Sequence, residues 1–319
     1  MPDTEPAVFA AVYGTKNRSR APALSETITI MSVDVSAPAR VGESRLANGR
    51  VIGWSEWGRP DGVPVLLSPG AATTGSLGFG AAVVDSLGVR LIALDRPGLG
   101  RSTPMPGKTF RAFAADVGEL IELRDLGKPA LVGNSQGAPF ALACAAAGVG
   151  AAVAIVSGSD EVAAPRFADD LPGPLRELVE LTATDPGAAE RIFATFDADA
   201  MWQMVIESSP ASDRAVYRDP VFEHSYRGSL REAFAPGPTG YARDTVLAMG
   251  RWPFELTTID VPVDLWYGDQ DTSHSPDQGE WLAARIPGAV RHLVPGIGGA
   301  VLWTHAEPIL RTLLGHVPT

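Results

Sequence analysis

Short apolar runs that end in Gly, Ser or Asp alternate with helical patterns along most of this chain. The runs lie at residues 50–58, 63–70, 89–95, 129–135, 151–158, 263–269 and 290–295. The segment 109–127 has a helical pattern that would end at Gly127 and that places five apolar residues on one face: Phe110, Phe113, Val117, Leu120 and Ile121. Alternation of this kind builds a mostly parallel sheet covered by helices on both faces. We therefore expect an α/β fold.

The alternation is interrupted once, in residues 161–255. This segment contains several helical patterns separated by turn-forming stretches such as "DPG" and "PGPTG", and it has no strand pattern. A helical block inserted between two strands is a natural lid over a site. We expect a core at 41–160 and 256–319, a lid at 161–255, and an N-terminal extension at 1–40 that is either an upstream addition or a flexible tail.

The charge balance limits the class of partner. Lys and Arg total 26 against 37 Asp and Glu, a net charge of -11. Such an excess repels nucleic acids and anionic membranes. In the first thirty residues a short apolar run precedes the basic residues, which is the wrong order for a secretory signal, and no later segment reaches the roughly 20 apolar residues of a membrane span. We expect a cytoplasmic protein with a small-molecule partner; its oligomeric state is left open.

Metal and cofactor chemistry has no motif in this sequence. The single cysteine, Cys144, lies in the apolar run "PFALACAAAG", where a buried thiol is expected and no cysteine metal site or intrachain disulfide can form. The sequence contains no H-E-x-x-H, no P-loop and no dinucleotide fingerprint after a strand. We expect an activity that uses neither a metal nor a cofactor.

The segment "LVGNSQGAPFALACA" carries the strongest chemical signal. An apolar strand runs into Gly133, Ser135 and Gly137, spaced G-x-S-x-G, and an Ala-rich helix follows. This spacing fits a sharp strand-to-helix elbow that leaves the serine standing at the sheet edge. The N-terminus of the following helix would favour a developing oxyanion. The segment therefore predicts a nucleophilic serine.

From about residue 43 to its end, the chain resembles the α/β-hydrolase superfamily. The matching pieces stand in the family's order: "GWSEWGRPDGVPVLLSPG", "LDRPGLGRS", "GNSQGA", a lid-sized insertion, "VDLWYGDQD" and "VPGIGG". The resemblance implies the α/β-hydrolase fold with an inserted helical lid. It also implies a carboxylesterase-like serine hydrolase that acts on a small apolar ester or related acyl substrate.

The resemblance assigns roles to individual residues. Ser135 matches the nucleophile, and the backbone NH groups of Gln136 and Ala71 match the oxyanion donors. Asp271 stands three residues after Gly268, at the family's G-x-x-D position for the acid that orients the histidine. Two alternatives for the acid, Asp160 and Glu161, follow the preceding strand, and Asp269 is expected to shape the turn.

The expected histidine is missing. Family members commonly end the last strand with G-x-G-H, and here Gly299 takes the fourth place. This pattern predicts a deleted general base, impaired or altered catalysis, and a void the size of an imidazole ring beside Ser135, which Gly299→His would fill with a gain of activity. His274, in the loop of Asp271, is a candidate substitute base. His305 is expected only to pack near a helix start.

The lid also carries large apolar residues that would either pack within it or form a pocket wall. Trp202, Met204 and Trp252 are the candidates for that wall. Three functions stay open: an acyl hydrolase altered at position 299, a non-hydrolytic cyclase or lyase on the same scaffold, and a ligand-binding protein without catalysis.

Overall fold

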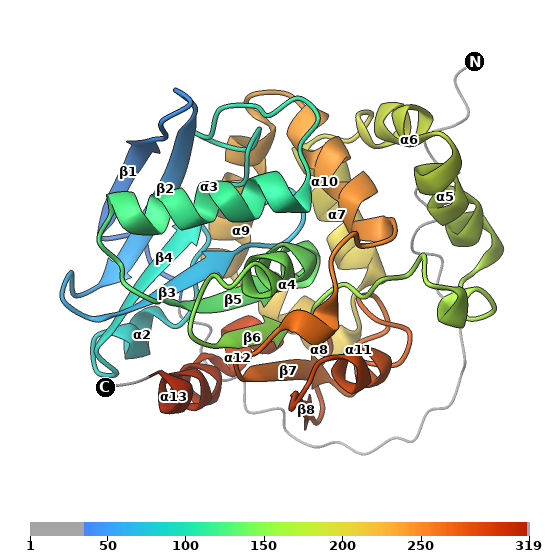
Figure 1. Cartoon of the computed structure of the whole chain (residues 1–319). Coiled ribbons are helices and arrows are strands. Elements are labelled where there is room, and N and C mark those ends of the chain that lie inside the picture. Colours follow the sequence, from blue (N-terminus) through green and yellow to red (C-terminus); the bar gives the residue numbers. More distant parts are fainter. Residues whose placement is uncertain (1–34, 318–319) are drawn as a thin grey trace.

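The computed structural model describes residues 35–317, so most of the extension expected at 1–40 lies outside the described residues. An eight-stranded sheet runs through the described part, in the order β1-β2-β4-β3-β5-β6-β7-β8 (Figure 1). The strands are β1 (Arg40–Arg45), β2 (Val51–Gly58), β3 (Val63–Ser68), β4 (Val89–Leu94), β5 (Ala130–Asn134), β6 (Val153–Val156), β7 (Val263–Gly268) and β8 (Val290–Val294).

The sheet is mostly parallel, which confirms the predicted fold class. Strands β3 to β8 pair in parallel, whereas β2 pairs antiparallel with both β1 and β4. The apolar runs of the sequence do not predict β1. Its residues, RVGESR, alternate between half-buried and exposed because β1 is an edge strand with one face in water, so it lacks a continuous apolar run.

Two hydrophobic clusters lie on opposite faces of the sheet. In β3, Leu66 belongs to one cluster and Leu67 to the other, as the alternation of side chains along a strand requires. The first face is covered by α3 (Phe110–Leu123), α4 (Ala138–Ala146) and α11 (Glu280–Arg285). The opposite face is covered by α2 (Ala81–Val84), α12 (Val301–Thr304) and α13 (Ala306–His316).

Helix α3 follows the predicted pattern closely. The hydroxyl of Thr109 caps its N-terminus by accepting a hydrogen bond from the NH group of Ala112, at 3.1 Å. All five apolar residues expected on one face are buried. The helix ends at Leu123 instead of Gly127, because Asp125 takes a left-handed conformation two residues later, with φ 49°.

Six α-helices and no strand occupy the segment between β6 and β7. They are α5 (Gly173–Thr184), α6 (Pro186–Phe193), α7 (Ala198–Ser208), α8 (Ala211–Tyr217), α9 (Pro220–Phe234) and α10 (Thr239–Met249). We call this segment the helical insertion. Helix α10 packs on α6, and α7 packs on α9. Among residues 35–317, no helix is both long and apolar enough to cross a membrane.

Candidate active site

Ser135 stands at a sharp turn between β5 and α4. Its φ of 50° is unusual for a residue with a side chain and marks a strained position. A Cβ atom at Gly133 would lie 2.8 Å from Cα of Ala138, and one at Gly137 would lie 2.0 Å from the carbonyl oxygen of Ser68. The packing of the turn therefore excludes side chains at both glycines. The strand-to-helix elbow predicted from the sequence is present.

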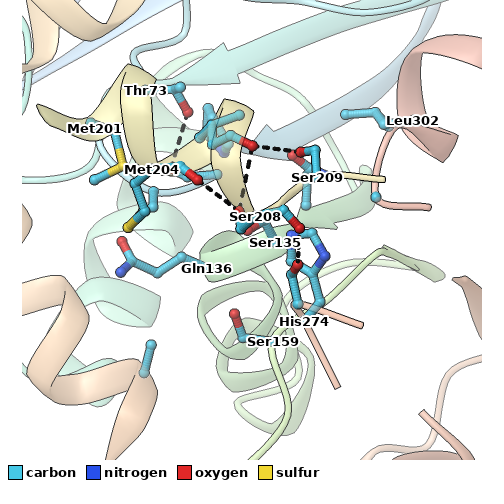
Figure 2. A pocket seen from close by; sticks show the side chains of 18 of the residues that line it. Thr73, Ser135, Gln136, Ser159, Met201, Met204, Ser208, Ser209, His274 and Leu302 are labelled. Atoms are coloured by element: carbon cyan, nitrogen blue, oxygen red, sulfur yellow. Dashed lines mark hydrogen bonds between the residues drawn. The ribbon is translucent and has the colours of Figure 1, made fainter. Parts of the chain in front are cut away.

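Ser135 faces a cavity of about 170 Å³ (Figure 2). The cavity lies between the ends of β3 and β5 and the helices α7, α8 and α10. Its wall is largely apolar and aromatic, formed by Leu67, Leu77, Leu175, Met201, Met204, Val205, Tyr217, Tyr226, Tyr241, Ala248, Met249, Leu302 and Trp303. Hydroxyl groups interrupt this wall at Thr73, Ser159, Ser208 and Ser209. The shape and lining suit a small organic molecule.

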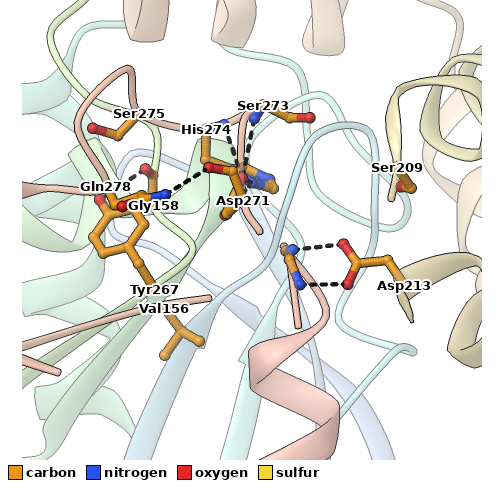
Figure 3. A network of polar contacts seen from close by, with 12 residues as sticks. Val156, Gly158, Ser209, Asp213, Tyr267, Asp271, Ser273, His274, Ser275 and Gln278 are labelled. Carbon is orange, nitrogen blue, oxygen red and sulfur yellow. Dashed lines mark hydrogen bonds and ion pairs between the residues drawn. The ribbon is translucent and has the colours of Figure 1, made fainter. Parts of the chain in front are cut away.

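His274 lines the same cavity, and its ring is held by Asp271 (Figures 2 and 3). Nδ1 of His274 lies 2.9 Å from Oδ2 and 3.0 Å from Oδ1 of Asp271. The backbone NH groups of Ser273 and His274 also donate to Oδ1. Since Nδ1 faces the carboxylate, Nε2 is the ring nitrogen left for chemistry. The described residues show no hydrogen bond between Ser135 and His274; such bonds often tighten only when substrate is bound.

Burial and charge act in opposite directions on this pair. Burial alone would raise the pKa of Asp271, but the charge and hydrogen bond of His274, with two backbone NH groups, lower that pKa below its usual range. Burial alone would lower the pKa of His274, but the charge and hydrogen bond of Asp271 raise it above its ordinary value, with a further contribution from Asp213. The pair is therefore arranged to stabilise an imidazolium ion.

The predicted empty site for a side chain at position 299 is wrong: Gly299 lines the cavity, but the space into which its side chain would point is already occupied. A Cβ atom at position 299 would lie 2.6 Å from Cε1 and 3.1 Å from Nδ1 of His274. The ring of His274 thus occupies the room that the missing side chain would need. Gly299 has no left-handed φ, unlike Gly296 at 76°. Position 299 requires glycine for space and not for backbone freedom.

A sequence model of the alpha/beta hydrolase family matches residues 65–311 of this chain. The chain belongs to this family. A relative named putative non-heme chloroperoxidase, from Synechocystis, is 25% identical over 271 residues, which cover 79% of this chain and 90% of the relative. A proline iminopeptidase from Neisseria meningitidis is 29% identical over 115 residues, which cover 35% of this chain and 37% of that protein.

Solved structures of low sequence identity share the fold. A bromoperoxidase from Bacillus anthracis superposes with a TM-score of 0.63 at 21% identity, covering 87% of this chain and 99% of that one. An enol-lactonase from Burkholderia xenovorans gives a TM-score of 0.62 at 20% identity, covering 86% and 99%. These similarities confirm the alpha/beta hydrolase fold.

Only one of the three residues predicted for the pocket wall of this alpha/beta hydrolase lines the cavity. Met204 does so, whereas Trp202 and Trp252 do not. Trp202 packs edge-on against Tyr226, with ring centroids 5.7 Å apart. Trp252 stacks on Phe254 at the same separation, and its Nε1 donates to the carbonyl oxygen of Ala248. Trp202 thus packs within the insertion, against α9, whereas Trp252 belongs to the hydrophobic cluster beneath α3 and α4.

The alternative acids are engaged elsewhere. Asp160 accepts hydrogen bonds from Ser275 and Arg285, and burial raises its pKa to about 6. Glu161 pairs with Arg285 at 2.5 Å. Neither carboxylate contacts the ring of His274 within the described structure. Asp269 accepts a hydrogen bond from the NH group of Gly296 at 2.8 Å, so its side chain bonds the loop after β8.

Two further residues lie outside the predicted site. His305 bonds Thr304 at the start of α13 and does not line the cavity, as expected for a packing histidine. Cys144 is buried in α4, and burial raises its pKa to about 12. Among the residues that the structure describes, no cluster of His, Cys, Asp and Glu is suited to a metal ion.

The two residues predicted to supply the oxyanion donors, Ala71 and Gln136, both line the cavity. A fully buried arginine, Arg96, bonds both the loop before Ala71 and the side chain of Gln136. Its guanidinium donates to the carbonyl oxygens of Pro69 and Gly70 and to Oε1 of Gln136. The sequence does not indicate this role, because Arg96 lies in the loop motif "LDRPGLGRS", which carries no signal for a contact with Gln136.

Arg96 and its neighbours tie this loop to the helical insertion. Nε of Arg96 lies 2.8 Å from Oδ2 of Asp244 in α10, and Nζ of Lys108 lies 2.5 Å from Oδ1 of the same carboxylate. Nζ of Lys108 also donates to the carbonyl oxygen of Pro97 at 2.6 Å. Two cations thus share one buried carboxylate, which fixes α10 against the loop that carries the oxyanion donors.

Proposed function

We propose that this chain is a serine hydrolase that cleaves small uncharged carboxylic esters, with Ser135 as nucleophile, His274 as general base and Asp271 as orienting acid. The observation that carries the proposal is the bond of His274 Nδ1 to Asp271 in the cavity that Ser135 faces. The expected loss of catalysis assumed an empty position at Gly299. Since His274 fills that position, we expect a complete triad whose base comes from the acid's own loop.

In this mechanism, Nε2 of His274 takes the hydroxyl proton of Ser135 as Oγ attacks the ester carbonyl carbon. The backbone NH groups of Ala71 and Gln136 donate to the resulting oxyanion. The imidazolium then returns the proton to the departing alkoxide, which leaves as an alcohol. Water hydrolyses the acyl-serine by the same steps, and the acid is released. Asp271 keeps His274 in the tautomer with the proton on Nδ1 and stabilises the positive charge of the imidazolium.

The lining of the cavity supports an uncharged substrate. Among the described residues that form it, none is Lys or Arg, and two are carboxylates, Asp160 and Asp213. A substrate with a free carboxylate would meet repulsion there and find no cationic partner. The solved structures with this fold include proteins named esterase and enol-lactonase, which supports ester or lactone chemistry.

The test compares ester hydrolysis by the wild type with that of three variants, Ser135→Ala, His274→Ala and His305→Ala. We expect the first two to lose at least about a thousandfold in kcat and the third to lose nothing, because a triad acts as a unit. A fluorophosphonate probe should label the wild type and fail to label Ser135→Ala. Free imidazole should partly restore His274→Ala, because the deletion leaves a ring-sized space beside Gly299.

Other outcomes would favour the two other functions. Conversion of a non-ester substrate that survives Ser135→Ala would indicate a cyclase or lyase. Tight binding of an apolar ligand without any product would indicate a binding protein. Full ester hydrolysis by His274→Ala would show that the base lies elsewhere and would overturn the proposed triad.

A further inference from the structure

Asp213 is a buried carboxylate that reaches the site from the helical insertion. It lies in α8, lines the cavity and is 1% exposed. Its Oδ1 accepts a hydrogen bond from the NH group of Gly298 at 2.8 Å, and its Oδ2 accepts one from Gly299 at 2.6 Å (Figure 3). Within residues 35–317, no Lys or Arg forms an ion pair with Asp213. Burial raises the pKa of Asp213 above its ordinary value, and the backbone NH groups that bond it offset only part of this rise.

The turn that Asp213 holds is the surface against which His274 packs. A Cβ atom at position 299 would lie 2.6 Å from Cε1 of His274 and 3.7 Å from Oδ2 of Asp213. A Cβ atom at Gly298 would lie 2.5 Å from Oδ2 of Asp213. The two glycines therefore make room for a carboxylate from the insertion on one side and for the imidazole on the other.

We propose that Asp213 is a positioning residue through which the helical insertion sets the competence of His274. When α8 is seated, its carboxylate fixes the Gly298–Gly299 turn, and the turn supports the imidazole in the cavity. If α8 were displaced, the turn would lose this support and His274 would lose one wall of its site. The inference rests on the proposed function, since it assigns His274 as the base.

The charge of Asp213 provides a signature that a merely structural contact lacks. The charged groups that act on the ring of His274 are Asp271 from its own loop and Asp213 from α8. Tyr217, also in α8, lines the same cavity. The backbone NH group of Asp160 donates to the carbonyl oxygen of His274 at 3.3 Å. Asp271 and Asp213 both favour the imidazolium form and raise the pKa of His274. Removing one negative charge should therefore lower that pKa.

The experiment measures kcat and the pH dependence of kcat/KM with p-nitrophenyl butyrate for Asp213→Asn and Ser212→Ala. Ser212 is the matched control, because its hydroxyl ties the same helix to Oε1 of Gln270 at 2.9 Å without carrying a charge. We expect Asp213→Asn to lower kcat about tenfold, since a misplaced base is costly. Its acid limb should move to lower pH by about one unit. Ser212→Ala should show neither change.

Two results would overturn the inference. The first is a folded Asp213→Asn variant with the kcat and the pH profile of the wild type. The second is a loss of kcat in Ser212→Ala equal to that in Asp213→Asn, with the acid limb unmoved in both variants, which would indicate simple docking of the insertion.

If Asp213→Asn does not fold, Asp213→Glu keeps the charge and displaces the turn. It should keep the acid limb and lower kcat, and an unchanged kcat would contradict the inference. If wild-type hydrolysis survives Ser135→Ala, the proposed function fails first and the inference falls with it.

Discussion

The imidazole of His274 packs against the backbone of Gly299, so that a Cβ atom at position 299 would lie 2.6 Å from Cε1 of the ring. The two residues are 25 positions apart in the chain and come from different loops, one after β7 and the other after β8. The loops meet because Gly268 lets the second one approach: a Cβ atom there would lie 2.1 Å from the carbonyl oxygen of Ile297. A histidine from one loop thus occupies the space left by a glycine in the other.

This contact reverses the expected effect of restoring a histidine. Gly299→His should lower kcat/KM for short esters by about a hundredfold or more, because the new side chain displaces His274. Gly299→Ala should cause a smaller loss in the same direction. Gly315→Ala is the control, since a Cβ atom there meets nothing within 4 Å. A gain of activity in folded Gly299→His would show that His274 is not the base.

The pH dependence follows from the raised pKa of His274. The base acts in its neutral form, so kcat/KM should rise with pH through an apparent pKa above the ordinary value of about 6.5. Asp271→Asn removes the charge that contributes most to the raised pKa of His274. The acid limb of its kcat/KM profile should therefore lie at lower pH than that of the wild type, and its maximal rate should fall. A limb that stays in place in Asp271→Asn would contradict the pairing of these residues.

Arg96 should matter for catalysis as well as stability. Arg96→Lys keeps the charge but removes the planar fork that reaches Pro69, Gly70 and Asp244 together. We expect kcat to fall about tenfold, because the oxyanion donors lose their support. We also expect a loss of about 1 to 3 kcal/mol in the free energy of unfolding, because buried carbonyls lose donors.

Arg243→Lys is a comparison for this variant. It changes an arginine of α10 that joins the insertion to the core through the carbonyl oxygen of Lys108 and that also binds Oε1 of Glu190 in α6. It should lower the melting temperature with kcat almost unchanged. Equal effects of the two variants on kcat would mean that Arg96 acts only by holding the insertion in place.

Substrate preference should depend on Met204 and not on the neighbouring tryptophans. Met204→Ala enlarges the cavity, so the ratio of kcat/KM for octanoyl over acetyl esters should rise several-fold. Trp252→Ala lies outside the cavity and should cost about 3 to 5 kcal/mol of unfolding free energy with that ratio unchanged. A changed preference in Trp252→Ala would place its indole at the pocket wall.

Cys144 should be unreactive in the folded protein. Burial raises the pKa of its thiol to about 12, so very little thiolate forms at neutral pH. A chromogenic disulfide reagent should therefore modify less than one equivalent over hours in buffer and one equivalent in denaturant. Rapid modification of the native protein would indicate that α4 opens on a short timescale.

The fold could be predicted from the sequence because its signals are local. Apolar runs of strand length, the amphipathic pattern of α3 and the G-x-S-x-G spacing around Ser135 each depend on residues close together in the chain. The edge strand β1 was not predictable in this way, since its polar residues face water on one side. The insertion was visible because its helical patterns interrupt the alternation of strands.

Part of the site was equally local. The spacing of Asp271 from Gly268 and the position of His274 in the same loop are properties of one short segment. The sequence therefore named Asp271 as the candidate acid and His274 as a candidate substitute for the missing base. The resemblance to the family assigned Ser135, Ala71 and Gln136 to one site, and all three line the same cavity.

The tertiary structure alone decided which residue fills the space at Gly299 and what supports it. Read along the chain, Gly299 is a missing histidine, and Asp213 is an ordinary charge in an insertion without a motif. The hydrogen bond between Asp213 and Gly299 joins two residues that are 86 positions apart in the chain. Such contacts depend on how α8 packs against the turn after β8. The physical reason is that each buried side chain must fit the volume and the charge of its neighbours in space, and the spacing of residues along the sequence does not specify those neighbours.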